Sequence, residues 1–212
     1  MHDFIAGTIS GALYTIVGYP FDTLKIWNQN NTQYKNPKIN IKNLYRGGKI
    51  PIIQNSLIMA STLYINNNIY NTNVYISSFC SGIFSTLIYT PFDYYKINIQ
   101  QQTQVKLSNS YKKIHIVALH EIPSNMIFFT TYKKCKSYNI SHEISGATSG
   151  VLCSIFIYPL NTIKTRMQSN LKLSLKDAIA GNKLYNGFSY SLIRSILCGG
   201  IGMSCFEKLK SI

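Results

Sequence analysis

A ten-residue pattern occurs three times in this chain, and each copy places a proline inside an apolar, helix-like stretch. The copies read PFDTLKIWNQ from Pro20, PFDYYKINIQ from Pro91 and PLNTIKTRMQ from Pro159. A proline in a helix interior costs about 3 kcal/mol, so three at matched positions are hard to explain by chance. The pattern therefore predicts three related structural units, and this constrains the fold more than any other feature.

Each copy carries the same kinds of polar side chain at the same spacing. An acid or Asn lies two residues after the proline, a Lys five and a Gln nine residues after it: Asp22, Lys25 and Gln29; Asp93, Lys96 and Gln100; Asn161, Lys164 and Gln168. Small residues also recur 13 and nine positions before each proline, namely Gly7, Gly11, Ser78, Gly82, Gly146 and Gly150. Small residues at this spacing allow helices to approach closely in lipid.

A second module follows each copy. The triplets YRG at 45–47, YKK at 111–113 and YNG at 185–187 precede apolar runs over 50–70, 116–136 and 189–209. These runs are close to the roughly 20 residues that a bilayer core requires. The sequence therefore predicts an all-α membrane protein with six transmembrane helices. They form three helix-pair repeats, at 1–72, 73–139 and 140–212, within one domain.

The positive charges are unevenly placed, which supports this layout. The chain has a net charge of +14, and Lys or Arg residues gather in the linkers 28–49, 100–115 and 169–188. The opposite linkers, 70–74 and 137–141, contain neither, although Lys133, Lys134 and Lys136 close the fourth helix. The positive-inside rule assigns the three basic linkers to the inner side of a membrane. A soluble nucleic-acid-binding protein is the alternative, but its charges should follow one helix face.

No motif for catalysis or cofactor binding is present. The sequence contains no Gly-rich phosphate loop, no HExxH and no nucleophile elbow. The five cysteines form no CxxC pair and lie in apolar segments, so we expect buried free thiols: Cys80, Cys135, Cys153, Cys198 and Cys205. The sequence therefore predicts neither an enzyme nor a cofactor or metal site.

The triple P-x-[D/E/N]-x-x-K-x-x-x-Q pattern, with its downstream aromatic and basic module, resembles the mitochondrial carrier family. The resemblance implies a six-helix bundle with threefold pseudosymmetry that exchanges solutes by alternating access. It would act as a monomer in the mitochondrial inner membrane, of its own cell or of a host, in contact with lipid and not with nucleic acid. The chain is shorter than a usual carrier in its three matrix-side linkers. We therefore expect the short helices there to be curtailed or absent.

The prolines should kink the odd-numbered helices and bring the following charges together at the matrix side. An ionisable group at membrane depth needs a partner or water. We therefore predict a matrix gate in which Asp22 pairs with Lys96, Asp93 with Lys164 and Lys25 with Asn161. The glutamines one turn further on, Gln29, Gln100 and Gln168, would brace the gate through hydrogen bonds. The alternative is solvated charges at helix ends.

The opposite gate of the family uses an aromatic–acid–x–x–basic motif late in each even-numbered helix. Phe206 and Glu207 with Lys210 fit this motif, whereas Tyr132 is followed by a lysine and the second helix offers only asparagines. We therefore expect the cytoplasmic side to be sealed by packing more than by ion pairs.

Three residues lie seven positions after the third residue of each aromatic module: Gln54, His120 and Arg194. Equal offsets predict one common depth facing one cavity, and in the family this level carries the main substrate contacts. Arg194 and the basic surplus favour an anion, and Tyr190 could stack on a base, so a nucleotide or deoxynucleotide is the leading substrate. The alternative is an amino acid or another zwitterion, with Glu121 on its ammonium group and Arg194 on its carboxylate. His120 could also be an ordinary core histidine.

Overall fold

The computed structural model describes residues 2–29, 44–45, 48–68, 73–100, 110–169, 174–180 and 184–210. These residues form helices and no strand, which confirms the all-helical class. Six helices are long and one is short: α1 (His2–Gln29), α3 (Lys49–Asn68), α4 (Val74–Gln100), α5 (Ile114–Ser137), α6 (His142–Ser169), α7 (Leu175–Ala180) and α8 (Phe188–Lys210). The bounds of α3, α5 and α8 agree closely with the three predicted apolar runs.

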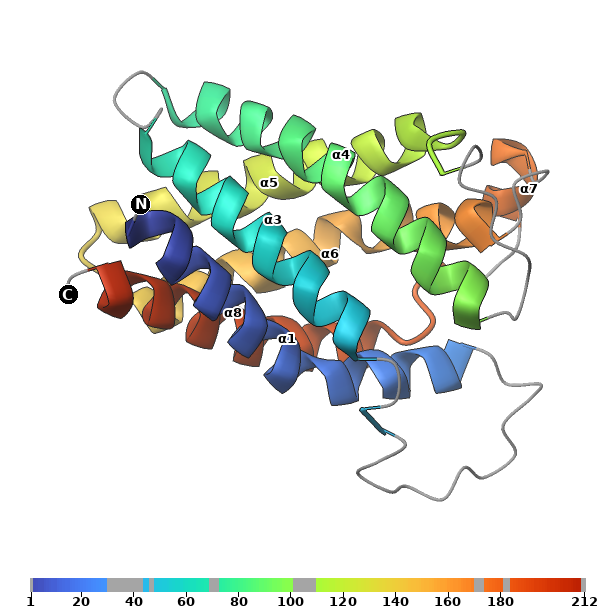
Figure 1. The fold of residues 1–212 in the computed structure, drawn as a ribbon, viewed down its shortest axis with the longest axis horizontal. Helices are drawn as coiled ribbons and strands as arrows, with labels where there is room; N and C mark the ends of the chain where they lie inside the picture. Colours follow the sequence, from blue (N-terminus) through green and yellow to red (C-terminus); the bar gives the residue numbers. More distant parts are fainter. Residues whose placement is uncertain are drawn as a thin grey trace.

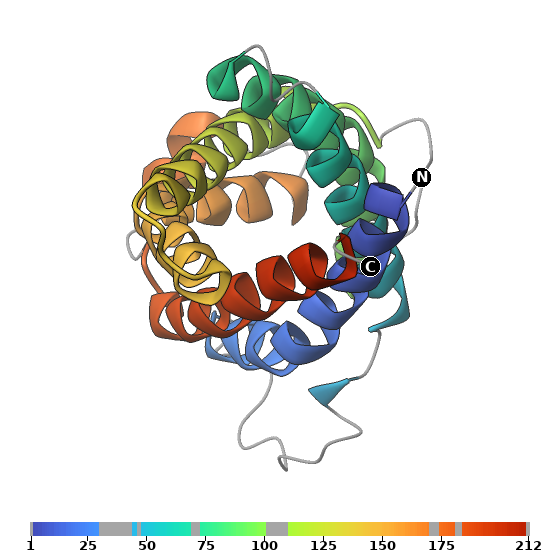
Figure 2. The ribbon, with the colours of Figure 1, turned by 90° about the vertical axis from the view of Figure 1, so that its left-hand side faces the viewer.

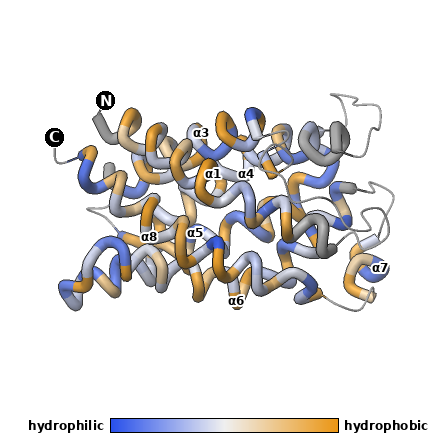
Figure 3. The backbone as a smooth tube through the Cα atoms, turned by 90° about the horizontal axis from the view of Figure 1, so that it is seen from below, coloured by the Kyte–Doolittle hydropathy of each residue, from blue (hydrophilic) through white to orange (hydrophobic). Residues whose placement is uncertain are grey.

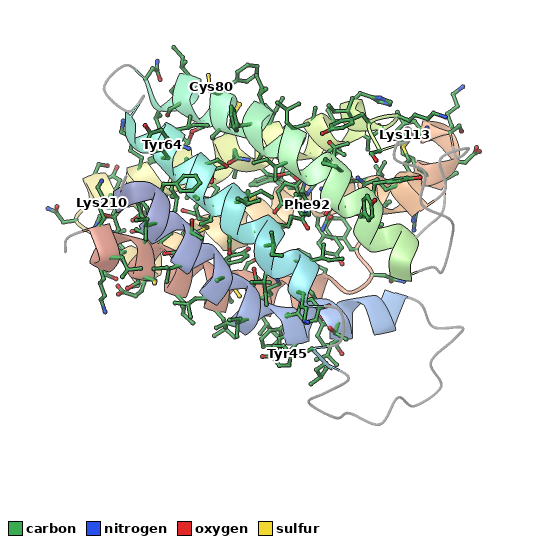
Figure 4. All side chains as sticks on the ribbon, viewed as in Figure 1. Tyr45, Tyr64, Cys80, Phe92, Lys113 and Lys210 are labelled. Carbon is green, nitrogen blue, oxygen red and sulfur yellow. The ribbon has the colours of Figure 1, made fainter. Side chains whose placement is uncertain are left out.

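The six long helices form a closed ring around a central axis. Each helix packs against its neighbours in the order α1, α3, α4, α5, α6 and α8, and α8 returns to α1. Figure 2 shows this ring end on. Both termini lie at one end of the bundle, whereas α7 lies at the other end (Figure 1). The labelled Lys210 and Lys113 mark these two ends in Figure 4.

Prolines lie inside four of the long helices. Pro20, Pro91 and Pro159 interrupt α1, α4 and α6 as the pattern predicts, and α1 visibly changes direction along its length (Figure 1). Pro123 lies inside α5. A proline leaves carbonyls of the preceding turn without their usual donors. In α5, the missing N–H of Pro123 affects the carbonyl of Leu119, and the neighbouring carbonyl of His120 accepts a hydrogen bond from Ser124 Oγ at 2.6 Å.

Small residues hold neighbouring helices at short range. A Cβ atom at Gly7 would lie 2.6 Å from the Cα of Ala60, so α1 and α3 meet backbone to backbone there. On α4 the interior face is made of serines that are fully buried: Ser77, Ser78, Ser81 and Ser85. Several of their hydroxyls donate to carbonyls three or four residues earlier in the same helix. The predicted close packing of small residues is confirmed at Gly7, Gly11, Gly82, Gly146 and Gly150, where an added Cβ would meet the neighbouring helix.

One contact joins a helix to its linker in the same way at two places. Thr23 Oγ1 donates to the carbonyl of Leu44 at 2.8 Å, and Thr162 Oγ1 donates to the carbonyl of Leu184 at 2.7 Å. Both threonines lie three residues after a pattern proline, and both leucines directly precede an aromatic module. Stacked tyrosine rings accompany each bond, Tyr19 with Tyr45 and Tyr158 with Tyr185. In the second unit Tyr94 occupies the threonine position.

The third basic linker contains the six-residue helix α7, which packs against α6. Ala178 of α7 is buried against Ile163 and Met167, and Arg166 donates to the carbonyl of Ala178 at 2.8 Å. A curtailed helix is therefore present in this linker, as the chain's short length predicts. The corresponding parts of the first two linkers lie almost entirely outside the described residues.

The long helices differ in hydropathy. Within the described residues two helices contain a stretch long and apolar enough to cross a membrane by composition, Phe4–Leu24 and His142–Gln168. Figure 3 shows hydrophobic and hydrophilic positions interleaved along the helices. Large apolar side chains such as Phe84, Leu87 and Phe156 are exposed, whereas serines, threonines and several charged groups are buried. The polar residues that lower the mean hydropathy thus lie toward the inside of the ring.

Candidate functional site

A buried ion cluster lies near the end of the bundle that is opposite the termini. Lys164 Nζ lies 2.8 Å from Asp93 Oδ2 and 3.0 Å from Glu121 Oε1. The same ammonium group lies over the ring of Tyr89, 4.6 Å from its centroid. Lys164 and Glu121 are only 5% and 4% exposed. The predicted pair of Asp93 and Lys164 is therefore present, and Glu121 is a second carboxylate partner that the pattern did not predict.

Two further side chains extend this cluster. Gln54 Nε2 donates a hydrogen bond to Asp93 Oδ1 at 2.7 Å, and His120 Nδ1 lies 2.8 Å from Glu121 Oε1. The cluster thus joins α3, α4, α5 and α6 through one continuous chain of polar contacts. Buried charges are tolerable only when their hydrogen-bonding capacity is met, and here each carboxylate has two partners.

A second ion pair joins α8 to α1. Arg194 Nε lies 2.9 Å from Asp22 Oδ1, without the alignment of a hydrogen bond. Its Nη1 donates to the hydroxyl of Tyr14 at 3.1 Å, and the guanidinium lies 4.8 Å from the centroid of that ring. Tyr14, Gly18 and Asp22 share one face of α1 because they are four residues apart. A Cβ at Gly18 would lie 2.9 Å from Arg194 Nε, so this glycine makes the room that Arg194 fills.

The remaining predicted gate residues are described only in part. The side chains of Lys25, Gln29, Lys96 and Gln100 lie outside the described residues, and with them the pairs Asp22–Lys96 and Lys25–Asn161. Asp22 has a partner that was not predicted, Arg194. Gln168 is buried, and the structure shows no hydrogen bond from its side chain to any other residue it describes. The role of Gln168 as a brace therefore stays a prediction.

Gln54, His120 and Arg194 do not line a common cavity, which corrects the sequence-based expectation. Gln54 of α3 reaches Asp93 of α4, and Arg194 of α8 reaches Asp22 of α1, so each binds the acid of the next helix around the ring. The equivalent position next to His120 is Asn161, which has no charge, and His120 binds Glu121 instead. Successive residues of a helix are separated by about 100°. Two of the three residues one position later, Asn55 and Glu121, line the central cavity, whereas Ser195 packs against Gly150 and Ser154 of α6.

The central cavity has a volume of about 180 Å³ and is lined by residues from all six long helices. Its polar wall includes Tyr14, Asn55, Tyr89, Glu121 and Asn125. Glu121 alone among the described lining residues carries a charge. Tyr190 is half-buried on α8 and is not part of this lining. The cavity therefore presents a carboxylate, and no guanidinium or ammonium group, to a solute.

Hydrogen bonds between helices hold the polar wall in place. Asn55 Nδ2 donates to Thr15 Oγ1 at 3.1 Å, and Tyr89 donates its hydroxyl proton to Asn55 Oδ1 at 3.3 Å. Asn125 Nδ2 donates to Ser85 Oγ at 3.1 Å. Both amide side chains are thus committed to neighbouring helices. Their role is to position the wall around Glu121.

The end of the cavity toward the termini is apolar. Ala6, Leu63, Met203 and Phe206 form a buried cluster from α1, α3 and α8. Partly buried residues of α5 pack against it, namely Phe128, Phe129 and Tyr132. Tyr132 also hydrogen-bonds through its hydroxyl to His142 Nδ1 at 2.7 Å. Phe206 of the predicted cytoplasmic motif therefore lies within a packed apolar layer, which we call the apolar end.

The described residues contain no group of three or more His, Cys, Asp or Glu side chains suited to hold a metal ion. The five cysteines are free thiols, of which Cys198 is buried and the other four are partly buried.

The sequence is similar to those of known transporters. The sequence model of the mitochondrial carrier protein family matches residues 136–180. The mitochondrial ornithine transporter 1 of Schizosaccharomyces pombe is 25% identical over 270 residues, covering 96% of this chain and 90% of that protein. A mitochondrial arginine transporter of Arabidopsis thaliana is 24% identical, with 78% and 73% covered. Others are named only as members of solute carrier family 25.

A carrier-like protein of Acanthamoeba polyphaga mimivirus is 25% identical over 215 residues, with 92% and 90% covered. Because 215 residues make up 90% of the viral protein, whereas 270 make up 90% of the ornithine transporter, the viral protein is the shorter of these two relatives. The chain is a short, divergent relative of the mitochondrial carriers.

Proposed function

We propose that this protein is a multi-pass carrier of the mitochondrial inner membrane that exchanges a basic amino acid by alternating access. In this proposal the three helix pairs at 1–72, 73–139 and 140–212 act as one transport domain. The substrate binds in the central cavity, with a cationic group on Glu121. The exchanged partner solute takes the same site in the return half of the cycle.

The observation that carries this proposal is the charge of the cavity wall. Glu121 is the charged group of the described lining, and its carboxylate is buried. Lys164 and His120 already contact this carboxylate, so a cationic substrate group takes over the compensation of its charge when Lys164 leaves during gate opening. The names of two relatives, the ornithine and arginine transporters, specify solutes with cationic side chains. The charge of the cavity wall and the names of these relatives therefore both favour basic amino acids as the substrate class.

A nucleotide, the leading substrate by sequence alone, is not supported. That expectation depended on Arg194 as a ligand for anions, and Arg194 is already occupied by Asp22 and Tyr14 outside the cavity lining. The cavity of about 180 Å³ is also smaller than the roughly 300–1,000 Å³ of pockets for drug-sized ligands. A single amino acid suits this volume better than a nucleoside phosphate does.

The distribution of polar and apolar residues supports a location in lipid. Exposed Phe, Ile and Leu side chains cover the outer faces of the ring, whereas the interior contains serines, amides and ion pairs. A soluble protein normally shows the reverse arrangement. Intramembrane charges that face a bundle interior and pair with one another are typical of solute pathways.

We further propose a matrix gate at the level of the buried ion cluster. Its residues would be Asp22, Lys25, Asp93, Lys96, Asn161 and Lys164, with Gln29, Gln100 and Gln168 as braces. Opening toward the matrix requires Lys164 to leave its carboxylates. Because Glu121 touches both Lys164 and the cavity, a substrate cation on Glu121 replaces one of the two attractions on that lysine. Substrate binding then lowers the cost of opening by its differential affinity for the open state.

The substitution Glu121→Gln tests this function. The protein is reconstituted in vesicles loaded with unlabelled L-ornithine, and uptake of labelled L-ornithine, L-arginine and ADP is measured. Wild-type protein should take up the amino acids and not ADP. Glu121→Gln should lose amino acid uptake, because the amide cannot neutralise the ammonium group. It should also lose the rise in melting temperature that saturating L-ornithine gives the wild type.

A matched control is Asp177→Asn, which neutralises an exposed acid on α7, outside the cavity. This variant should retain wild-type uptake and the ornithine-dependent rise in melting temperature. Uptake of ADP by the wild type, with no uptake of any basic amino acid, would overturn the proposed substrate class.

A further inference from the structure

We propose that Tyr14 binds the carboxylate of the substrate and so makes the carrier prefer an amino acid over the amine of the same skeleton. The inference rests on the proposed function and adds the second half of the substrate site. The substrate-binding residues predicted from the sequence include none of α1.

The hydroxyl of Tyr14 is prepared to donate to an anion. It accepts a hydrogen bond from Arg194 Nη1 at 3.1 Å, and this leaves its own proton available. The part of the chain that the structure describes supplies no acceptor for that proton. The guanidinium that donates to this oxygen makes the hydroxyl a stronger donor, because hydrogen bonds assisted by charge in this way are stronger than neutral ones.

Tyr14 is also the route by which Arg194 acts on the cavity. Arg194 itself is not part of the cavity lining, because it lies along α1 between Tyr14 and Asp22 in the space beside Gly18. Tyr14 does line the cavity. A solute carboxylate therefore meets the phenol first, with the positive charge held directly behind it.

The position of Tyr14 gives the cavity two different poles. The ring order places α1 opposite α5, because α1 packs against α3 and α8 whereas α5 packs against α4 and α6 (Figure 2). Tyr14 and Glu121 thus belong to opposite walls of one cavity. A basic amino acid carries cationic groups and a carboxylate, so one molecule can satisfy both walls.

Tyr89 provides the contrast within the same cavity. Its phenol also belongs to the lining, but its proton is donated to Asn55 Oδ1 at 3.3 Å. Its ring, in turn, lies under the ammonium group of Lys164. Tyr89 therefore belongs to the wall and the ion cluster, and we assign carboxylate recognition to Tyr14 alone of these two tyrosines.

The test compares L-ornithine with 1,4-diaminobutane, which lacks only the carboxylate. Each unlabelled compound competes with labelled L-ornithine for uptake by wild type, Tyr14→Phe and Tyr89→Phe in vesicles. Tyr14→Phe keeps the ring against Arg194 and removes the hydroxyl. A hydrogen bond to a charged group is worth about tenfold or more in affinity. The inhibition constant of L-ornithine should therefore rise about tenfold in Tyr14→Phe, and that of the diamine by less than about twofold.

Tyr89→Phe should change the two inhibition constants by the same factor, because its hydroxyl acts on the wall. Equal factors for both compounds in Tyr14→Phe, or no change for L-ornithine, would overturn the role of Tyr14. Binding in detergent, measured as the shift in melting temperature with each compound, repeats the comparison if Tyr14→Phe is inactive in vesicles. Failure of the wild type to recognise any basic amino acid would instead refute the proposed function, so the two failures are distinguishable.

Discussion

The two ends of the central cavity are closed by different physical means. Toward the basic linkers, Asp93, Glu121 and Lys164 form a buried cluster of charges, with distances of 2.8 and 3.0 Å from the ammonium group to the two carboxylates. Toward the termini, Leu63, Phe206 and their neighbours form the apolar end. Both layers draw on helices from different parts of the sequence, yet only the first depends on the chemical identity of each residue.

This difference indicates which end of the cavity tolerates substitutions and which does not. A buried ion cluster is stable only when it is complete, because removal of one member leaves another charge without compensation. Apolar packing has no direction, so another apolar side chain of similar volume can replace the first. We therefore expect the charged cluster to respond to small chemical changes and the apolar end to respond mainly to volume.

The largest effect is expected from Lys164→Met, which removes the cation of the buried ion cluster. The substitution leaves the carboxylates of Asp93 and Glu121 close together without a cation. Removal of one partner from a buried pair costs about 3–5 kcal/mol, so the melting temperature in detergent should fall strongly and exchange in vesicles should stop. The variant Lys164→Arg should also lose exchange, because the larger guanidinium cannot make the same contacts as the ammonium group.

Two further variants identify the cause of that loss. The double variant Lys164→Met with Glu121→Gln removes one of the stranded charges and should recover part of the lost melting temperature. Lys176→Met removes an exposed lysine of α7 and should change stability by no more than about 0.5 kcal/mol. Equal losses in Lys164→Met and Lys176→Met would contradict a buried, mutually dependent cluster.

A smaller effect is expected from Leu63→Ala at the apolar end. Leu63 is 3% exposed, but it also borders the cavity, which reduces the packing that the leucine makes. We expect a loss of about 2 kcal/mol, at the low end for a buried leucine. Leu63→Met should cost less than about 1.5 kcal/mol and keep exchange. The melting temperatures of both variants decide this, and a loss in Leu63→Met as large as in Leu63→Ala would show that this end is also chemically specific.

The smallest effect is expected from Thr162→Val, which measures one neutral hydrogen bond beside the charged end. The substitution removes the bond to the carbonyl of Leu184 and should cost about 1 kcal/mol. Thr165→Val is the matched control, since that exposed hydroxyl bonds only within its own helix, to the carbonyl of Asn161. If Thr162→Val lowers the melting temperature no more than Thr165→Val, the linker contact contributes nothing to stability. The difference between Thr162→Val and Lys164→Met isolates the part due to charge.

The helices were predictable because their signals are local. The apolar runs at 50–70, 116–136 and 189–209 correspond to α3, α5 and α8, and the three prolines lie inside α1, α4 and α6. The pair of Asp93 and Lys164 also followed from the pattern, since matched offsets in related units place residues at matched depths. A further signal was available: Thr23 and Thr162 occupy the same offset after their prolines and make the same linker contact.

The partners of Arg194 and Glu121 were not predictable in the same way. Offsets in sequence give the depth of a residue along a helix, whereas the direction of its side chain depends on how the helix is rotated about its axis. A shift of one position turns a side chain by about 100°. This is why Glu121 faces the cavity and Lys164, while Arg194 lies along Tyr14, Gly18 and Asp22 on α1.

The sequence by itself determined the helical class, the approximate helix boundaries and the level at which charges gather, because these depend on periodicity, hydrophobicity and spacing along one chain. The tertiary structure decided which charges meet, which side chains line the cavity and which phenol keeps a proton to donate. Those outcomes depend on helix rotation and on contacts between residues as far apart as Tyr14 and Arg194. Packing of the whole ring fixes such contacts, and no local segment contains them.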